Sequence, residues 1–260
     1  MGKWRMDELD KDSTVSGAPR FWVPGPLEAG SRIDLPERAA RHIGVRRLRE
    51  GNAIVLFDGN GGEFPAILGK VTRQGVSAEI GAGRDVERES PLQLTLAQGI
   101  SSGDRMDLTL QKATELGVTA IVPLACERSV VRLSAERAVR RLEHWRQILI
   151  SACEQCGRNQ LPQLAPVMDL DDWLASLGPS QDQRLLLDPL AEVGMAAVRL
   201  PPASGVLLLV GPEGGLAGHE CAAARRSGFE SARLGPRVLR TETAPLAAIA
   251  ILQALHGDLG

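Results

Sequence analysis

The stretch LLLVGPEGGL, residues 207–216, decides the fold of the C-terminal part of the chain. Its apolar, β-forming start runs straight into Gly-Pro, which predicts a buried strand that ends in a sharp turn. Gly211, Gly214 and Gly215 lack Cβ atoms, so a ligand can come close to the main chain there. The loop carries Glu213 and no Lys or Arg, which argues against a bound phosphate. A neutral or cationic ligand fits better, and S-adenosylmethionine, a sulfonium that carries an adenosine, is one such molecule.

A second glycine–proline turn follows about twenty residues later in LGPRVLRTETAPLAAIAILQALHGDL, residues 234–259. Arg237 and Arg240 flank two apolar residues, and Thr243 is expected to cap a helix with Pro245 in its first turn. The helix from Ala244 to Leu255 is apolar almost all round, so it is expected to be buried on more than one side. The two loops therefore follow successive strands and are expected to form walls of one site.

From residue 92 the pattern alternates between strands and helices. We expect strands at 92–100, 118–123, 185–187, 206–210 and 231–234, and helices at 104–116 and 134–156. Such alternation predicts an α/β fold with a parallel sheet, and binding loops gather at the carboxyl ends of parallel strands.

Residues 20–88 have a different pattern of short strands and glycine turns. A helix is expected at 37–45 and strands at 53–57, 63–68 and 76–80, which together suggest a small β-barrel. Residues 82–90 are charged and end at Pro91, as in a linker. Residues 1–19 are polar and without periodicity, so we expect a flexible leader.

Composition limits the remaining possibilities. The 260 residues are 43% hydrophobic, enough for real cores, and show no signal peptide or long apolar span, so we expect a cytoplasmic protein with no membrane association. Four cysteines with a single CxxC, at Cys153 and Cys156, do not predict a disulfide framework or a metal site. The net charge of −2 does not identify a nucleic-acid binder.

Arginines nevertheless cluster in one short segment. Arg38, Arg41, Arg46, Arg47 and Arg49 lie close together in the sequence. A local basic patch of this kind suits contact with a phosphate backbone. A solvated helix face is the alternative interpretation.

The chain resembles the RsmE-type methyltransferases of the SPOUT class, through GPEGGL, EQCGR and LGPRVLRTETAPLAAIAILQ. The resemblance runs from about Arg20 to the C-terminus and is most specific in the last fifty residues. It implies a PUA-like RNA-binding β-barrel domain at 20–88 and a trefoil-knotted, parallel-sheet SPOUT methyltransferase domain at 89–260. It also implies S-adenosylmethionine as cofactor, methylation of N3 of a uridine in 16S ribosomal RNA, and a homodimer.

The resemblance also implies roles for individual residues. The expected cofactor-binding residues are Leu187, Gly211, Pro212, Glu213, Gly214, Gly215, Leu234, Gly235, Val238, Leu239, Arg240 and Thr243. The expected catalytic residues are Arg240, Glu242, Glu154 and Arg158. The expected RNA-binding residues are Arg20, Arg41, Arg46, Arg47, Arg49 and Arg128, toward 16S rRNA or the small ribosomal subunit.

The chemistry of the acceptor leaves several assignments open. N3 of uracil carries an imide proton, so a base must remove it or a cation must stabilise the oxyanion that forms. Glu242 or Glu154 suits the first task, and Arg240 or Arg237 the second. Two other functions also remain: methylation of a ribose 2′-hydroxyl, and non-catalytic RNA binding in ribosome assembly.

Overall fold

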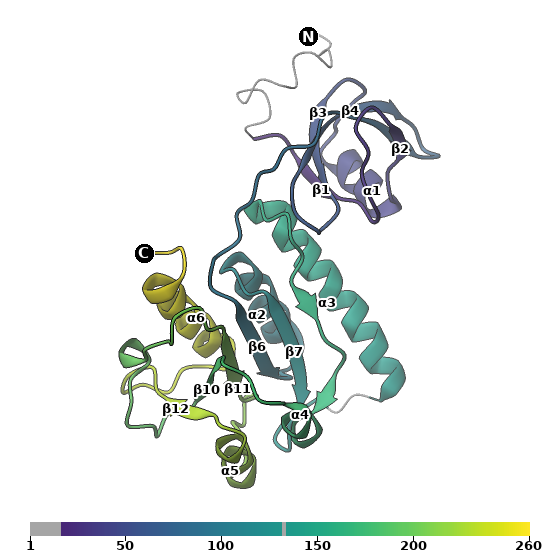
Figure 1. Ribbon diagram of the computed structural model, residues 1–260. Helices are drawn as coiled ribbons and strands as arrows, with labels where there is room; N and C mark the ends of the chain where they lie inside the picture. Colours follow the sequence, from purple (N-terminus) through teal and green to yellow (C-terminus); the bar gives the residue numbers. More distant parts are fainter. Residues whose placement is uncertain (1–16, 132–133) are drawn as a thin grey trace. The chain divides into compact units, whose positions relative to one another are not determined.

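The structure is a computed structural model that describes residues 17–131 and 134–260 (Figure 1). The predicted leader therefore lies, except for its last three residues, outside the described residues. The chain divides into two compact units. One unit runs to Glu89 and includes Cys153–Leu161, and the other holds Ser90–Ala152 and Pro162–Gly260.

The first unit is a five-stranded sheet with one helix. Its elements are β1 (Arg20–Trp22), β2 (Arg32–Asp34), α1 (Glu37–Val45), β3 (Ala53–Phe57), β4 (Phe64–Val71) and β5 (Val76–Ile80). The strand order is β1-β3-β4-β5-β2, in which only the β1–β3 pair is parallel. Strand β5 alternates buried and half-buried residues, and α1 buries Ala39 and Ile43 in the same core.

The second unit is an α/β domain built on a parallel sheet. Its elements through the middle of the chain are β6 (Leu94–Gly99), α2 (Gly103–Glu115), β7 (Ala120–Ala125), α3 (Ala135–Cys156, whose last turn belongs to the first unit), β8 (Gln163–Leu164), β9 (Met168–Asp169) and α4 (Leu170–Ser176). The remaining elements are β10 (Gln183–Leu187), η3 (Met195–Ala197), β11 (Val206–Val210), α5 (Gly218–Arg226), β12 (Glu230–Ala232) and α6 (Thr243–His256). The strand order is β12-β10-β11-β6-β7-β8, with β9 also on β7, and every pair is parallel.

Alternate residues of these strands face two separate cores. In β11, Val206 and Leu208 pack with α2, α3 and α6, whereas Leu209 faces α4 and α5. The same alternation in β10 places Leu185 in the core with α2, α3 and α6, and Leu186 in the core with α4 and α5. A sheet covered on both faces needs apolar residues on both sides of each strand, which explains the continuous apolar run of β11.

The predicted parallel sheet and flanking helices are confirmed. Helix α1 and strands β3, β5 and β11 have the predicted bounds, and most other predicted elements differ by one to three residues at an end. The strands β1, β2, β8 and β9 were not predicted, because two or three residues are too few to show a period. The helices α4 and α5 were not predicted either. The trefoil knot implied by the resemblance stays a prediction. No helix among the described residues has the length and apolar character needed to cross a membrane.

Candidate active site

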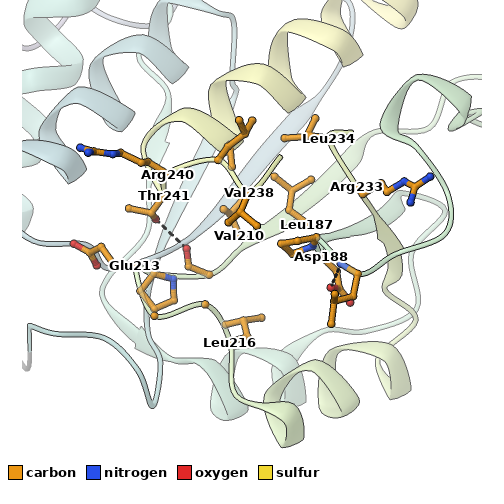
Figure 2. A pocket seen from close by; sticks show the side chains of 18 of the residues that line it. Leu187, Asp188, Val210, Glu213, Leu216, Arg233, Leu234, Val238, Arg240 and Thr241 are labelled. Atoms are coloured by element: carbon orange, nitrogen blue, oxygen red, sulfur yellow. Dashed lines mark hydrogen bonds between the residues drawn. The ribbon is translucent and has the colours of Figure 1, made fainter. Parts of the chain in front are cut away.

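A pocket of about 860 Å³ opens where β10, β11 and β12 end (Figure 2). Its walls are the three loops that leave these strands, because the carboxyl ends of parallel strands meet at one edge of a sheet. The residues that line it from the first two loops include Leu187, Asp188, Pro189, Leu190, Gly211, Pro212, Glu213, Gly214, Gly215 and Leu216. The third loop supplies Arg233, Leu234, Gly235, Arg237, Val238, Leu239, Arg240, Thr241 and Glu242.

Several glycines are required for the backbone to pass through this region. A Cβ atom on Gly99, at the end of β6, would lie 2.5 Å from the nitrogen of Pro212, and one on Gly211 would lie 2.9 Å from the nitrogen of Leu216. The positive φ in the loop falls on Gly215, at +65°. Gly214 has no positive φ, and its own constraint is different: a Cβ there would lie 2.9 Å from the Cβ of Arg128.

Glu213 is held at the edge of the pocket by the loop that precedes α2. Its Oε1 accepts hydrogen bonds from the main-chain nitrogen of Ser102 at 2.7 Å, the Ser102 hydroxyl at 2.8 Å and Nη1 of Arg105 at 3.1 Å. Burial by itself raises the pKa of this carboxyl, but the hydrogen bonds from Ser102 and Arg105 outweigh it and hold the pKa below its usual range. Glu213 is therefore a fixed negative charge at neutral pH.

A second carboxylate lies beside the first. The side chain of Glu242 is only 14% exposed, and its Oε2 lies 3.9 Å from Nε of Arg105. Nη1 of Arg240 lies 4.0 Å from the other oxygen, and its side chain is 79% exposed. In Figure 2, Arg240 points away from the apolar residues Leu187 and Val210. The pocket thus combines apolar walls with two carboxylates and an exposed guanidinium.

The structure brings together nearly all the residues predicted to bind a cofactor. Eleven of the twelve predicted residues line the pocket, and Thr243 does not. The predicted helix cap is also wrong by one residue: Glu242 is the N-cap of α6, and Thr243 is its first helical residue. The neighbouring Thr241 contacts the pocket in its place, with a hydroxyl that donates to the carbonyl oxygen of Gly211.

Glu154 and Arg158 do not line the pocket, and their catalytic role stays a prediction. Both lie in the segment Cys153–Leu161 of the first unit. Glu154 pairs with Arg38 at 2.6 Å and accepts a hydrogen bond from the main chain of Trp22. Arg158 is buried and paired with Glu89, and this pairing raises its pKa although burial lowers it. Both charged groups are thus held by ion pairs within the first unit.

The arginines predicted to bind RNA fall into three groups. Arg20 is half-buried, pairs with Glu63 at 2.5 Å and packs over the ring of Phe57, and its contact with RNA stays a prediction. Arg41, Arg46, Arg47 and Arg49 are exposed on α1 and the turn after it. Arg128 is exposed in the second unit, and its Nη1 lies 3.3 Å from the carbonyl oxygen of Gly214.

Some residues of the pocket were not predicted. Arg105 comes from the start of α2, and Cys221 and Arg225 come from α5. Arg225 donates to Asp188 at 2.7 Å and so ties α5 to the loop after β10. In the sequence, the one sign that Arg105 lines the pocket is that it follows shortly after the end of the strand predicted at 92–100. No cluster of three metal-ligating His, Cys, Asp or Glu side chains occurs among the described residues.

Comparison with known proteins agrees with this architecture. Residues 88–253 match the model of an RNA methyltransferase domain, and residues 35–81 match that of an RNA methyltransferase PUA domain. The chain is 31% identical to ribosomal RNA small subunit methyltransferase E of Bacillus subtilis, over 96% of this chain and 97% of that protein. The chain belongs to the ribosomal RNA small subunit methyltransferase E family. The resemblance seen in the sequence is thereby confirmed, as are the PUA domain and the SPOUT domain.

Solved structures of the family are equally similar. The enzyme of Neisseria gonorrhoeae, crystallised with S-adenosylmethionine, is 45% identical, has a TM-score of 0.89 and covers 94% of this chain and 100% of its own. A methyltransferase of Legionella pneumophila, also bound to S-adenosylmethionine, is 39% identical with a TM-score of 0.88 and covers 93% of this chain and 99% of its own. Both likenesses extend over the two units of the family fold.

Proposed function

We propose that this protein transfers a methyl group from S-adenosylmethionine to N3 of a specific uridine in 16S ribosomal RNA. The observation that carries the proposal is the three-loop pocket, in a chain whose family members from N. gonorrhoeae and L. pneumophila bind S-adenosylmethionine. Because ribosomal RNA is made and modified where ribosomes assemble, the protein is expected to act in the cytoplasm.

The residues of the pocket fit the proposed cofactor. A volume of about 860 Å³ is within the usual range for a site of this kind. Leu187, Val210 and Val238 offer apolar walls for a flat adenine ring, and Glu213 supplies negative charge for a cationic methionine group. The bound cofactor would supply an electrophilic methyl group, so the task of the protein is to position the acceptor and to remove its proton.

Glu242 and Arg240 are the residues that we propose for this task. Glu242 lines the pocket with a side chain that is 14% exposed, so we propose that its carboxylate accepts the imide proton of N3. Arg240 is exposed and extends from the same loop, where its guanidinium can stabilise the oxyanion that develops at O2 or O4. Arg237 also lines the pocket and is the alternative cation.

The proposed RNA-binding surface is the arginine patch of the first unit. Arg41, Arg46, Arg47 and Arg49 are exposed, and the PUA domain that carries them belongs to an RNA methyltransferase family. Guanidinium groups bind phosphate oxygens in a bidentate manner, so the patch suits contact with the backbone of 16S rRNA. Arg38 is excluded from this surface because it pairs with Glu154.

We also propose that the protein acts as a homodimer through α6. One face of the helix is buried in the core by Ala248, Ile249 and Leu252. The opposite face is also apolar, with Ala247 and Ala250 half-buried and Ala254 exposed. A second copy of the chain would cover this face through a two-fold contact.

Methylation of purified small ribosomal subunits with labelled S-adenosylmethionine tests the proposed function. The expected product is a uridine methylated on the base, identified by mass analysis of digested nucleosides. A methyl group on the ribose would support the 2′-hydroxyl alternative. Absence of both methylation and cofactor binding in calorimetry would support a non-catalytic RNA-binding protein.

A further inference from the structure

Gln98 is a fully buried amide at the end of the central strand β6. Its Nε2 lies 3.0 Å from the carbonyl oxygen of Gly99, 3.4 Å from that of Gly211 and 3.4 Å from the hydroxyl oxygen of Thr241. Gly211 and Thr241 line the pocket, whereas Gln98 is not among the lining residues. The side chain therefore reaches two pocket walls from behind, without entering the pocket.

Gly211 and Thr241 are also joined directly. The Thr241 hydroxyl, in a residue only 8% exposed, donates a hydrogen bond of 3.0 Å to the carbonyl oxygen of Gly211, drawn as a dashed line in Figure 2. One carbonyl oxygen thus accepts from both Gln98 and Thr241. These contacts connect the loop after β11 to the loop after β12, and both loops to β6.

The orientation of the Gln98 amide follows from its neighbours. The two carbonyl oxygens can only accept hydrogen bonds, so the NH₂ group must face them. The other end of the amide, Oε1, is buried and has no partner among the described residues. A buried acceptor without a partner lowers stability, and an apolar side chain of similar shape would avoid this cost. Gln98 is therefore poorly explained by stability alone.

We propose that Gln98 is a positioning residue that, together with Thr241, holds the two pocket loops at the separation that S-adenosylmethionine requires. This inference rests on the proposed function, since it concerns the affinity of the same pocket for that cofactor. Without the amide donor, the Gly211 carbonyl and the Thr241 hydroxyl can reorient, and the two walls can separate. Binding would then have to draw the loops together again, which weakens affinity.

The test compares Gln98→Leu and Thr241→Val with two control variants. Thr241→Ser keeps the hydroxyl group, and Gln93→Leu makes the same chemical change at an exposed position just before the same strand. Calorimetry is expected to give an S-adenosylmethionine Kd at least about tenfold higher for Gln98→Leu and Thr241→Val, and within about threefold of the unmodified protein for the controls. The double variant should lose less than the product of the two single effects, because both side chains act on one oxygen atom.

Two further measurements separate positioning from a structural role. The melting temperature of Gln98→Leu should equal or exceed that of the unmodified protein, and methylation should show a raised KM for S-adenosylmethionine with kcat retained. Unchanged cofactor affinity in either Gln98→Leu or Thr241→Val overturns the inference, as does a parallel loss of affinity and melting temperature in both. If Gln98→Leu does not fold, the inference is tested by comparing the S-adenosylmethionine affinity of Thr241→Val with that of Thr241→Ser. If the unmodified protein binds no S-adenosylmethionine, the proposed function fails, which is a distinct result.

Discussion

Replacement of Gly214 by Ala tests whether the pocket depends on close contact between two loops. The new Cβ atom would lie 2.9 Å from the Cβ of Arg128 and 3.2 Å from its carbonyl oxygen. Arg128 cannot easily withdraw, because the main-chain nitrogen of the preceding Glu127 is held by the buried carboxylate of Glu220 at 2.8 Å. The glycine loop must therefore move instead, away from Arg128.

The size of the effect follows from this displacement. Forcing an extra methyl group into a packed region costs about 1–3 kcal/mol. The free protein can relieve part of this strain by shifting the loop, but cofactor binding needs the loop in its original place. If binding must restore that position, affinity for S-adenosylmethionine falls by about 5-fold to 150-fold, since about 1.4 kcal/mol corresponds to a factor of ten. Gly214→Val should have a larger effect in the same direction.

Calorimetric titration measures the affinity for S-adenosylmethionine, and thermal unfolding measures the loss of stability. Gly178→Ala is the matched control, because Gly178 is exposed, has no positive φ, and a Cβ there meets nothing within 4 Å. The control should bind the cofactor like the unmodified protein. A folded Gly214→Ala variant that binds within twofold of the control would refute the close contact as a determinant of the pocket.

Three further predictions concern RNA, pH and assembly. Replacing both Arg46 and Arg47 by Ala should make the plot of log RNA affinity against log salt concentration shallower by roughly one unit of slope per lost phosphate contact, with cofactor affinity unchanged. An unchanged slope in filter binding would favour the alternative that the patch is only a solvated surface. Because the pKa of Glu213 is lowered in the folded protein, its ionised carboxylate adds to the free energy of unfolding, compared with Glu213→Gln. This contribution is complete above a pH of about 4.5 and declines as the pH falls toward the lower folded pKa. Denaturant titrations in which the unfolding free energies of the two proteins differ by a constant amount down to pH 3 would contradict this. Ala254→Asp should produce a folded monomer without methylation activity in sedimentation and activity assays, because it places a charge in the proposed contact. An unmodified protein that sediments as a monomer and still methylates RNA would exclude the dimer.

The sequence predicted the architecture well wherever an element has a clear period or a sharp boundary. Strand β11 was predicted with its bounds because five apolar residues stop at Gly211-Pro212. The loops at the ends of parallel strands then had to meet, which is why eleven of the twelve residues predicted to bind the cofactor line one pocket. Elements with such local patterns can be predicted without knowing which distant residues they contact.

The sequence is least informative where a partner far away in the chain decides what a side chain contacts. Glu154 and Arg158 lie at the end of a long helix, where a polar residue in the sequence can be catalytic, solvated or paired. Their partners, Arg38 and Glu89, are 116 and 69 residues away. The ion pair of Arg20 with Glu63 could not be predicted for the same reason, because the two residues are far apart in the sequence. Such pairings depend on the folded chain and leave no periodic signal.

The contacts of Gln98 could not be predicted from the sequence either. In the sequence it is one polar residue inside the strand LQLTLAQGI, with nothing to distinguish it from a surface glutamine such as Gln93. Its importance appears only when the loops after β11 and β12 fold back over the end of β6 and bring Gly211 and Thr241 to its amide.

The most direct test of the central claim is nucleoside mass analysis of 16S ribosomal RNA from cells with and without this protein. The proposed function predicts that 3-methyluridine is present in the first sample, absent from the second, and restored by the unmodified protein but not by a folded Glu242→Gln, Arg240→Ala double variant. The same 3-methyluridine content in both samples, or loss of a ribose-methylated nucleoside instead, would contradict it.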